Sequence, residues 1–177
     1  MTQGDAGGSV VERNGEANSS ADICVDLSGD YAVTGRPLPG MPDHYVVNSI
    51  RPTMDALLGL ELDRATSVKL ERARIVQDPN ALHFVFSGRN VEPVLKLFDH
   101  STGFVNCNAE KVVIQNVTEG AGEAVSGVAT ITRTLNISKN GGLVVRVTFV
   151  WRNRTLFVFW TQKEEYGVEY PSLSAKR

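Results

Sequence analysis

The clearest pattern in the chain is the alternation of apolar and polar side chains between residues 127 and 164. A period of two is typical of pleated strands that bury one face. Three alternating runs are separated by residues 138–142 and 152–155. The first separator contains Asn140-Gly141, a strong hairpin signal because both residues tolerate positive φ angles. The stretch therefore predicts a three-stranded antiparallel meander.

Shorter runs of the same kind precede the meander at about ten-residue spacing, which is typical of an all-β barrel or sandwich. One short helix is predicted at 53–63, where Thr53 can cap the first turn. We predict an antiparallel up-and-down β-barrel of about eight strands over residues 22–165. A flexible N-terminal arm or lid at 1–21 precedes it, and a C-terminal tail at 166–177 follows. Strands are expected at 23–27, 29–34, 67–76, 82–87, 91–98, 104–107 and 111–118.

Turn parity in the meander predicts which side chains face inward. A two-residue turn at Asn153-Arg154 would pair Trp151 with Leu156, and the alternating ladder then fixes the remaining pairs. One face is entirely apolar and is expected inside, whereas the opposite face is mixed and carries Phe157 and Phe159. The inward set is Val145, Val147, Phe149, Trp151, Leu156, Val158 and Trp160.

The position of Arg133 depends on the length of the preceding hairpin loop. An odd loop, such as 140–142, places Arg133 opposite Phe149 in the interior, and the apolar pattern prefers this arrangement. An even loop instead turns Arg133 outward and three threonines of the same strand inward. A buried guanidinium needs an anion, an aromatic face or another partner. A snorkelling or surface arginine is the alternative interpretation.

The candidate ligand-binding residues combine this apolar face with a few polar groups. Arg133 and Gln115 are the candidate polar anchors, although Gln115 also fits a structural side chain on a half-solvated strand. Large aromatic residues fit a simple core as well as a pocket. The candidates are Arg133, Gln115, Trp151, Trp160, Phe149, Val147 and Tyr31.

Composition excludes several classes of function. The formal net charge of −2 and the scattered basic residues predict no nucleic-acid or membrane partner. The histidines have no metal-ligand spacing and no glycine-rich phosphate loop occurs, so no metal and no cofactor are expected. Cys24 and Cys107 are expected to be reduced, with a single disulfide as the alternative. Without a signal-like apolar stretch near the N-terminus, we expect a cytoplasmic protein.

The stretch Leu27-Ser28-Gly29-Asp30-Tyr31 resembles the glycine-x-aromatic entry into the first strand of lipocalin-like (calycin) barrels. Tyr31 stands where those families usually have tryptophan, and the predicted helix lies early rather than after the last strand. The resemblance implies a barrel with a lipophilic pocket. Similar allene-oxide-cyclase-like barrels include cofactor-free cyclases of natural-product pathways.

Two hypotheses follow from the sequence. In the first, the barrel holds an apolar small molecule, and the protein is a binding protein or a cofactor-independent cyclase or isomerase with the N-terminal arm as its lid. In the second, the chain is a structural or interaction protein, such as a capsid-like sandwich subunit. It would form homo-oligomers through the outer face near Phe157 and Phe159, with the N-terminal arm assisting assembly.

Overall fold

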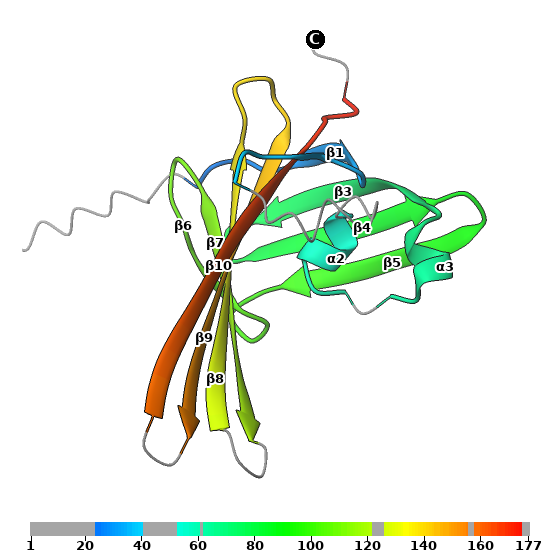
Figure 1. The fold of residues 1–177 in the computed structure, drawn as a ribbon. Coiled ribbons are helices and arrows are strands. Elements are labelled where there is room, and N and C mark those ends of the chain that lie inside the picture. Colours follow the sequence, from blue (N-terminus) through cyan, green and yellow to red (C-terminus); the bar gives the residue numbers. More distant parts are fainter. Residues whose placement is uncertain (1–23, 41–52, 61, 122–125, 156–157, 175–177) are drawn as a thin grey trace, which may run out of the picture.

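The computed structural model describes residues 24–40, 53–60, 62–121, 126–155 and 158–174, which form two antiparallel sheets and two short helices (Figure 1). The small sheet has the order β1 (Gly29–Ala32), β3 (Leu70–Asp78), β4 (Ala81–Gly88), β5 (Val91–Phe98). The large sheet has the order β2 (Arg36–Pro37), β10 (Val158–Tyr170), β9 (Leu143–Thr155), β8 (Ser126–Ile137), β7 (Val112–Ala121), β6 (Phe104–Cys107). The helices are α2 (Met54–Leu57) and α3 (Arg64–Ser67). The predicted N-terminal arm lies outside the described residues.

The mainly antiparallel β class is confirmed, but the described strands form two sheets and not the predicted closed barrel. Consecutive strands do pair as hairpins within each sheet. The chain changes sheet between β5 and β6, where the Asp99 carboxylate accepts hydrogen bonds from the backbone N–H groups of Ser101 and Thr102. Gly103 completes this turn with a φ of 108°. A local turn therefore starts a second sheet where the alternation alone predicts another barrel strand.

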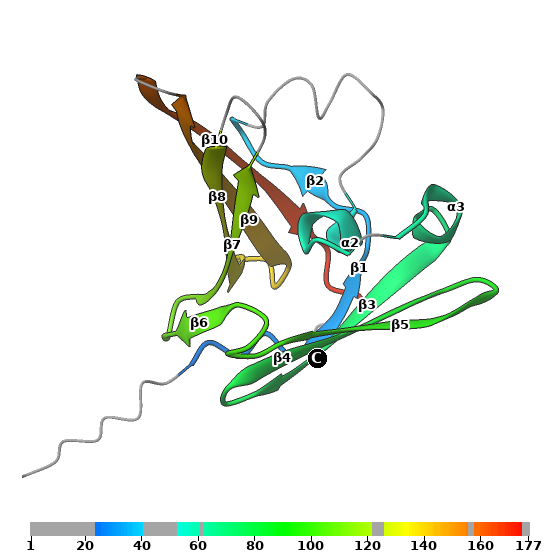
Figure 2. The same cartoon turned by 90° about the horizontal axis from the view of Figure 1, so that it is seen from below.

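Helix α2 fills the space between the two sheets (Figure 2). Met54, Leu57 and Leu58 are buried there and belong to the same core as the side chains of both sheets. The helix is shorter than the predicted 53–63 segment because Gly59 adopts a φ of 73°, which ends it. A packed helix therefore lies where the first hypothesis placed a ligand inside the barrel.

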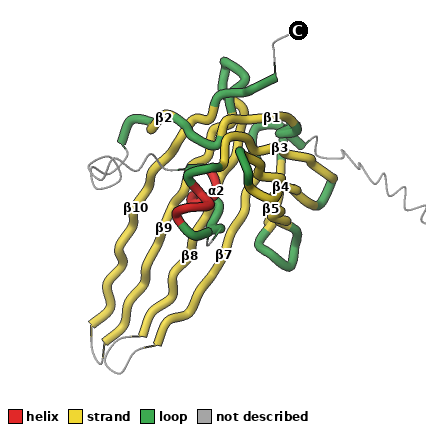
Figure 3. Tube along the Cα trace, turned by 90° about the vertical axis from the view of Figure 1, so that its right-hand side faces the viewer, coloured by secondary structure: helices red, strands yellow, loops and turns green. Residues whose placement is uncertain are grey.

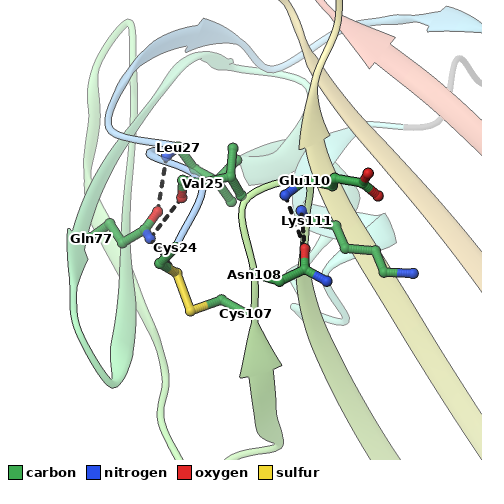
Figure 4. Close-up of a disulfide and its surroundings, with 8 residues drawn as sticks. All are labelled: Cys24, Val25, Leu27, Gln77, Cys107, Asn108, Glu110 and Lys111. Atoms are coloured by element: carbon green, nitrogen blue, oxygen red, sulfur yellow. Dashed lines mark hydrogen bonds between the residues drawn. A yellow bond between two sulfur atoms is a disulfide. The ribbon is translucent and has the colours of Figure 1, made fainter. Parts of the chain in front are cut away.

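A disulfide between Cys24 and Cys107 joins the segment before β1 to the edge strand β6 of the large sheet (Figure 4). The expectation of two reduced cysteines was therefore wrong, since sequence spacing carries no information on this pairing. The Gln77 side chain of β3 holds the same segment: its amide donates to the Val25 carbonyl at 2.8 Å, and its oxygen accepts from the Leu27 N–H at 2.9 Å. Disulfide and amide together connect the two sheets on one side.

A second connection joins the sheets through β1 and the chain that follows β10. Tyr31 forms an antiparallel bridge with Ser172, and the Ala32 N–H donates to the Pro171 carbonyl at 2.9 Å. The predicted tail at 166–177 therefore begins too early. Strand β10 continues to Tyr170 with the same alternation, and the side chains of Val168 and Tyr170 are fully buried.

On the small sheet, Asp30 of β1 is held by two arginines of the neighbouring strand β3. Its Oδ1 accepts from Arg72 Nε at 2.7 Å and from Arg74 Nε at 3.0 Å. The hydrogen bond from Arg72 is the largest of the effects that lower the pKa of Asp30 to about 2. A carboxyl with a depressed folded-state pKa stabilises the fold above its unfolded pKa, and this contribution disappears as the pH falls towards the folded-state pKa.

We therefore expect the wild-type protein to lose stability between pH 4 and pH 2 partly through Asp30. An Asp30→Asn variant should be less stable at neutral pH and lose less over this acidic interval. Denaturant unfolding at a series of pH values measures both effects. Asp26, an exposed neighbour of β1, provides the control as Asp26→Asn. If the free energy of unfolding fell equally steeply with pH in the wild type and in Asp30→Asn, the assignment to Asp30 would be contradicted.

The register of the last hairpin differs from the predicted one. Residues 152–155 remain in β9, and Trp151 pairs with Gln162, not with Leu156. The polar side chains of this segment do not form a turn because they continue the alternation, with Arg152 and Arg154 exposed and Asn153 buried. The register moves by an even number of residues, so Val158 and Trp160 keep the predicted face. Both side chains are nevertheless exposed, so they lie outside the core.

The large sheet has a covered half and a distal half that extends past the small sheet (Figures 1 and 3). We define the distal half as residues 115–121 of β7, 126–132 of β8, 148–155 of β9 and 158–165 of β10. The inner face of the sheet is the one that carries Val147, which the core covers. In these views the backbone of the distal half extends away from the small sheet, and the inner face of this half is the candidate site.

Candidate ligand-binding face

The large side chains of the inner face become more exposed towards the distal end, although the smaller Ala129 and Asn153 there are buried. Leu135 and Val145 form a fully buried pair, and in the next row Arg133 pairs with Val147. The side chains of Ile131 and Phe149, one row further, are half-buried. At the far end Trp160 is 41% exposed and Val158 is 58% exposed. Arg133 therefore lies at the boundary between the covered half and the distal half.

Arg133 is 6% exposed and connects the large sheet to helix α2. Its Nε donates to the Leu57 carbonyl at the end of the helix at 2.7 Å, and its Nη1 donates to Asn116 Oδ1 of β7 at 2.6 Å. Gly59 leaves room for the third nitrogen, because a Cβ at this position would lie 2.8 Å from Nη2. The odd-loop prediction placed Arg133 in the interior, as observed, although its partner is Val147 and not Phe149.

The charge of Arg133 is not matched by a carboxylate in the described part of the chain. None of the ion pairs among these residues includes Arg133. Burial lowers the pKa of its guanidinium, and Tyr166, in the same cross-strand row, acts in the opposite direction. Guanidinium groups stay protonated in proteins despite such shifts. Arg133 therefore carries a positive charge at the boundary between the two halves, and its two hydrogen-bond acceptors, from Leu57 and Asn116, are neutral oxygens.

Aromatic side chains form the surface beyond Arg133. The rings of Phe149 and Trp151 stack with centroids 5.9 Å apart, and the half-buried Ile131 pairs with Phe149 across the strands. Gly127 allows Trp151 to lie close to β8, because a Cβ there would be 3.1 Å from the indole nitrogen. Trp160 pairs with Asn153 on the adjoining strand. The result is a surface with several aromatic side chains and one buried cation at its inner end, and Glu164 and Gln162 of β10 share this face.

The structure brings together five of the seven predicted site residues and separates two. Arg133, Val147, Phe149, Trp151 and Trp160 share the inner face. Gln115 is exposed on the opposite face, where its amide donates to the Thr132 hydroxyl at 3.1 Å. This is also the face of Val113, as the spacing of two residues indicated. Tyr31 belongs to β1 in the small sheet, where its hydroxyl donates to the Leu27 carbonyl at 3.0 Å and its ring is core.

Sequence reasoning did not reveal the contacts of three further polar residues. Asn116 follows the buried Ile114 in phase, but the alternation does not specify a polar partner, and only the contact with Arg133 reveals its role. Tyr166 was assigned to the tail, although its period-two spacing with Val168 was a usable signal. Asp55, 2% exposed in α2, accepts a hydrogen bond from the Ser67 hydroxyl at 2.7 Å, whereas its Oδ1 has no partner among the described residues.

The described helices include none that is long and apolar enough to cross a membrane. Over the same residues, no group of three or more His, Cys, Asp or Glu side chains could hold a metal ion. No protein-family model, curated protein or solved structure matches the chain. The site must therefore be interpreted from its own geometry.

Proposed function

We propose that the protein binds an amphipathic small molecule with an anionic end on the inner face of the distal half. The observation that carries the proposal is the position of Arg133, a buried cation without a described carboxylate partner at the end of an aromatic surface. An incoming carboxylate would supply the missing negative charge, and charge-assisted hydrogen bonds to a guanidinium are among the strong ones.

The aromatic surface supports an apolar body on this ligand. Phe149, Trp151 and Trp160 occupy successive positions along the inner face, and large aromatic side chains contribute most of the apolar contact area in binding sites. Six residues of β8 separate the row of Arg133 from the row of Trp160, a distance of about 20 Å along an extended strand. A linear chain such as that of dodecanoate can extend along much of this distance.

We expect dodecanoate to bind more tightly than dodecanol, which has the same chain length without the charge. Both tryptophans of the chain lie on the proposed face, so intrinsic fluorescence reports on binding there directly. Trp160→Leu should weaken dodecanoate binding about tenfold, the loss of roughly 1.4 kcal/mol of aromatic contact.

Phe159 provides the matched control, since it is adjacent to Trp160 in β10 but lies on the opposite face and is 70% exposed. Phe159→Leu should leave dodecanoate binding unchanged. Equal affinities for dodecanoate and dodecanol would refute the role of Arg133. Equal losses in the Trp160 and Phe159 variants would show that the inner face is not the site.

Assembly into homo-oligomers is a second candidate function, which the edges of the distal half favour. Among the described residues, β10 pairs with β2 only at Val168 and Glu169, so its distal part has one open edge. Open edges can pair with strands of another molecule. Light scattering at high protein concentration separates the two candidates: a monomer that binds dodecanoate supports ligand binding, and an oligomer that does not bind it supports assembly.

A further inference from the structure

The tip of the large sheet carries a pocket, which lies mainly on the outer face, opposite to the aromatic surface. Its volume is about 660 Å³. Two arginines of β9, Arg152 and Arg154, reach it from neighbouring outward positions. Phe159 of β10 and Val128 of β8 add apolar surface. Gly127 and Asn153 add a part of the inner face at the tip, but the lining includes neither Arg133 nor its partners Leu57 and Asn116.

The two arginines are available to a ligand. Both are exposed, and the ion pairs of the described residues include neither of them. Positions two residues apart in a strand lie about 7 Å apart on the same face, so two flexible guanidinium groups can bind one tetrahedral anion between them. Guanidinium groups suit such oxyanions because several N–H donors lie in one plane.

Phe159 gives this pocket an aromatic component. It pairs directly with Arg154, whose guanidinium lies 5.3 Å from the ring centroid, within the range of a cation–π contact. The ring is 70% exposed, so a second planar group can stack on it. The opposite wall contains Glu119, whose β7 strand is two strands away from β9, about 10 Å across the sheet. This carboxylate disfavours a ligand that is anionic at both ends.

We propose that this outer tip pocket binds a small aromatic phosphate ester, with the phosphate between Arg152 and Arg154 and the ring against Phe159. The aromatic ring distinguishes the ligand from a free inorganic ion, since Phe159 contributes only to the ester. A monoester with its single phosphate near β9 also keeps negative charge away from Glu119.

The test measures binding of phenyl phosphate, inorganic phosphate and benzyl alcohol to the full chain by titration calorimetry at low ionic strength. Phenyl phosphate is expected to bind more tightly than either of the other two probes. Arg152→Gln and Arg154→Gln should each weaken its binding about tenfold, and Glu119→Gln should strengthen it about threefold. Phe159→Leu should reduce the affinity for phenyl phosphate towards that for inorganic phosphate.

Arg146 supplies the matched control, because it is an exposed arginine on the same face of the same strand but outside the pocket. Arg146→Gln should change phenyl phosphate affinity less than twofold. All five substitutions are at exposed positions, so circular dichroism should show unchanged folding. The proposal fails if phenyl phosphate does not bind at millimolar concentration, or if Arg146→Gln weakens binding as much as Arg152→Gln.

Discussion

Replacing both Cys24 and Cys107 by serine should lower the free energy of unfolding by about 4 kcal/mol. The disulfide joins residues separated by 83 positions, so it removes many conformations from the unfolded chain. In the chain-entropy description, a loop of this length contributes between the roughly 3 kcal/mol of a 15-residue loop and the 4.7 kcal/mol of a 100-residue loop. Denaturant unfolding with and without a reductant measures the difference.

The surrounding hydrogen bonds define the control for this experiment. Gln77 holds the same segment through Val25 and Leu27 without a covalent bond. Gln77→Ala should therefore reduce stability in the oxidised protein by about 1–3 kcal/mol, because two backbone groups lose their partner. If reductant left the wild-type midpoint unchanged, the disulfide would not be a stabilising element. Disulfides are typical of oxidising compartments, and the cytoplasmic location stays a prediction.

Arg133→Met should lower the free energy of unfolding by about 3 kcal/mol, the second-largest effect we expect. Methionine retains most of the side-chain length, but the Leu57 carbonyl and the Asn116 amide oxygen lose their donor. Unpaired buried acceptors cost more than a hydrogen bond normally contributes. Relief from burying the arginine charge offsets part of this loss.

Two further variants separate the role of Arg133 in the fold from its role in binding. Arg133→Lys keeps the charge and should retain the preference for dodecanoate over dodecanol, which Arg133→Met should lose. Gly59→Ala tests the contact from the helix side, and Gly40→Ala is its control. Both glycines have positive φ angles, but a Cβ at position 40 would meet nothing within 4 Å. If Gly59→Ala and Gly40→Ala lowered the free energy of unfolding equally, a tight contact between Gly59 and Arg133 would be contradicted.

The sequence predicted local features well because they depend on neighbouring residues. Alternation identified the strands of the meander and placed Val145 and Val147 inside. The parity of β10 remained correct although its turn was misplaced, since strand faces repeat every two residues. Tyr166 to Tyr170 followed the same rule and were nevertheless assigned to the tail.

The features that sequence did not reveal depend on distant parts of the chain. β1 pairs with β3, and β2 pairs with β10, although no alternation pattern specifies a partner. The same limit applies to the bond between Cys24 and Cys107 and to the contact between Arg133 and Asn116. Half of the predicted inner face lies beyond the small sheet, so Trp160 and Val158 are exposed despite facing the predicted side.

The division of the large sheet into covered and distal halves has a consequence for how the chain can change through evolution. In the covered half, the inward side chains pack against α2 and the small sheet, and a change of volume there acts on stability first. At the distal end, exposed side chains such as Val158 and Trp160 are little constrained by packing. Specificity for a binding partner can therefore diverge within one sheet while the scaffold that holds it stays the same.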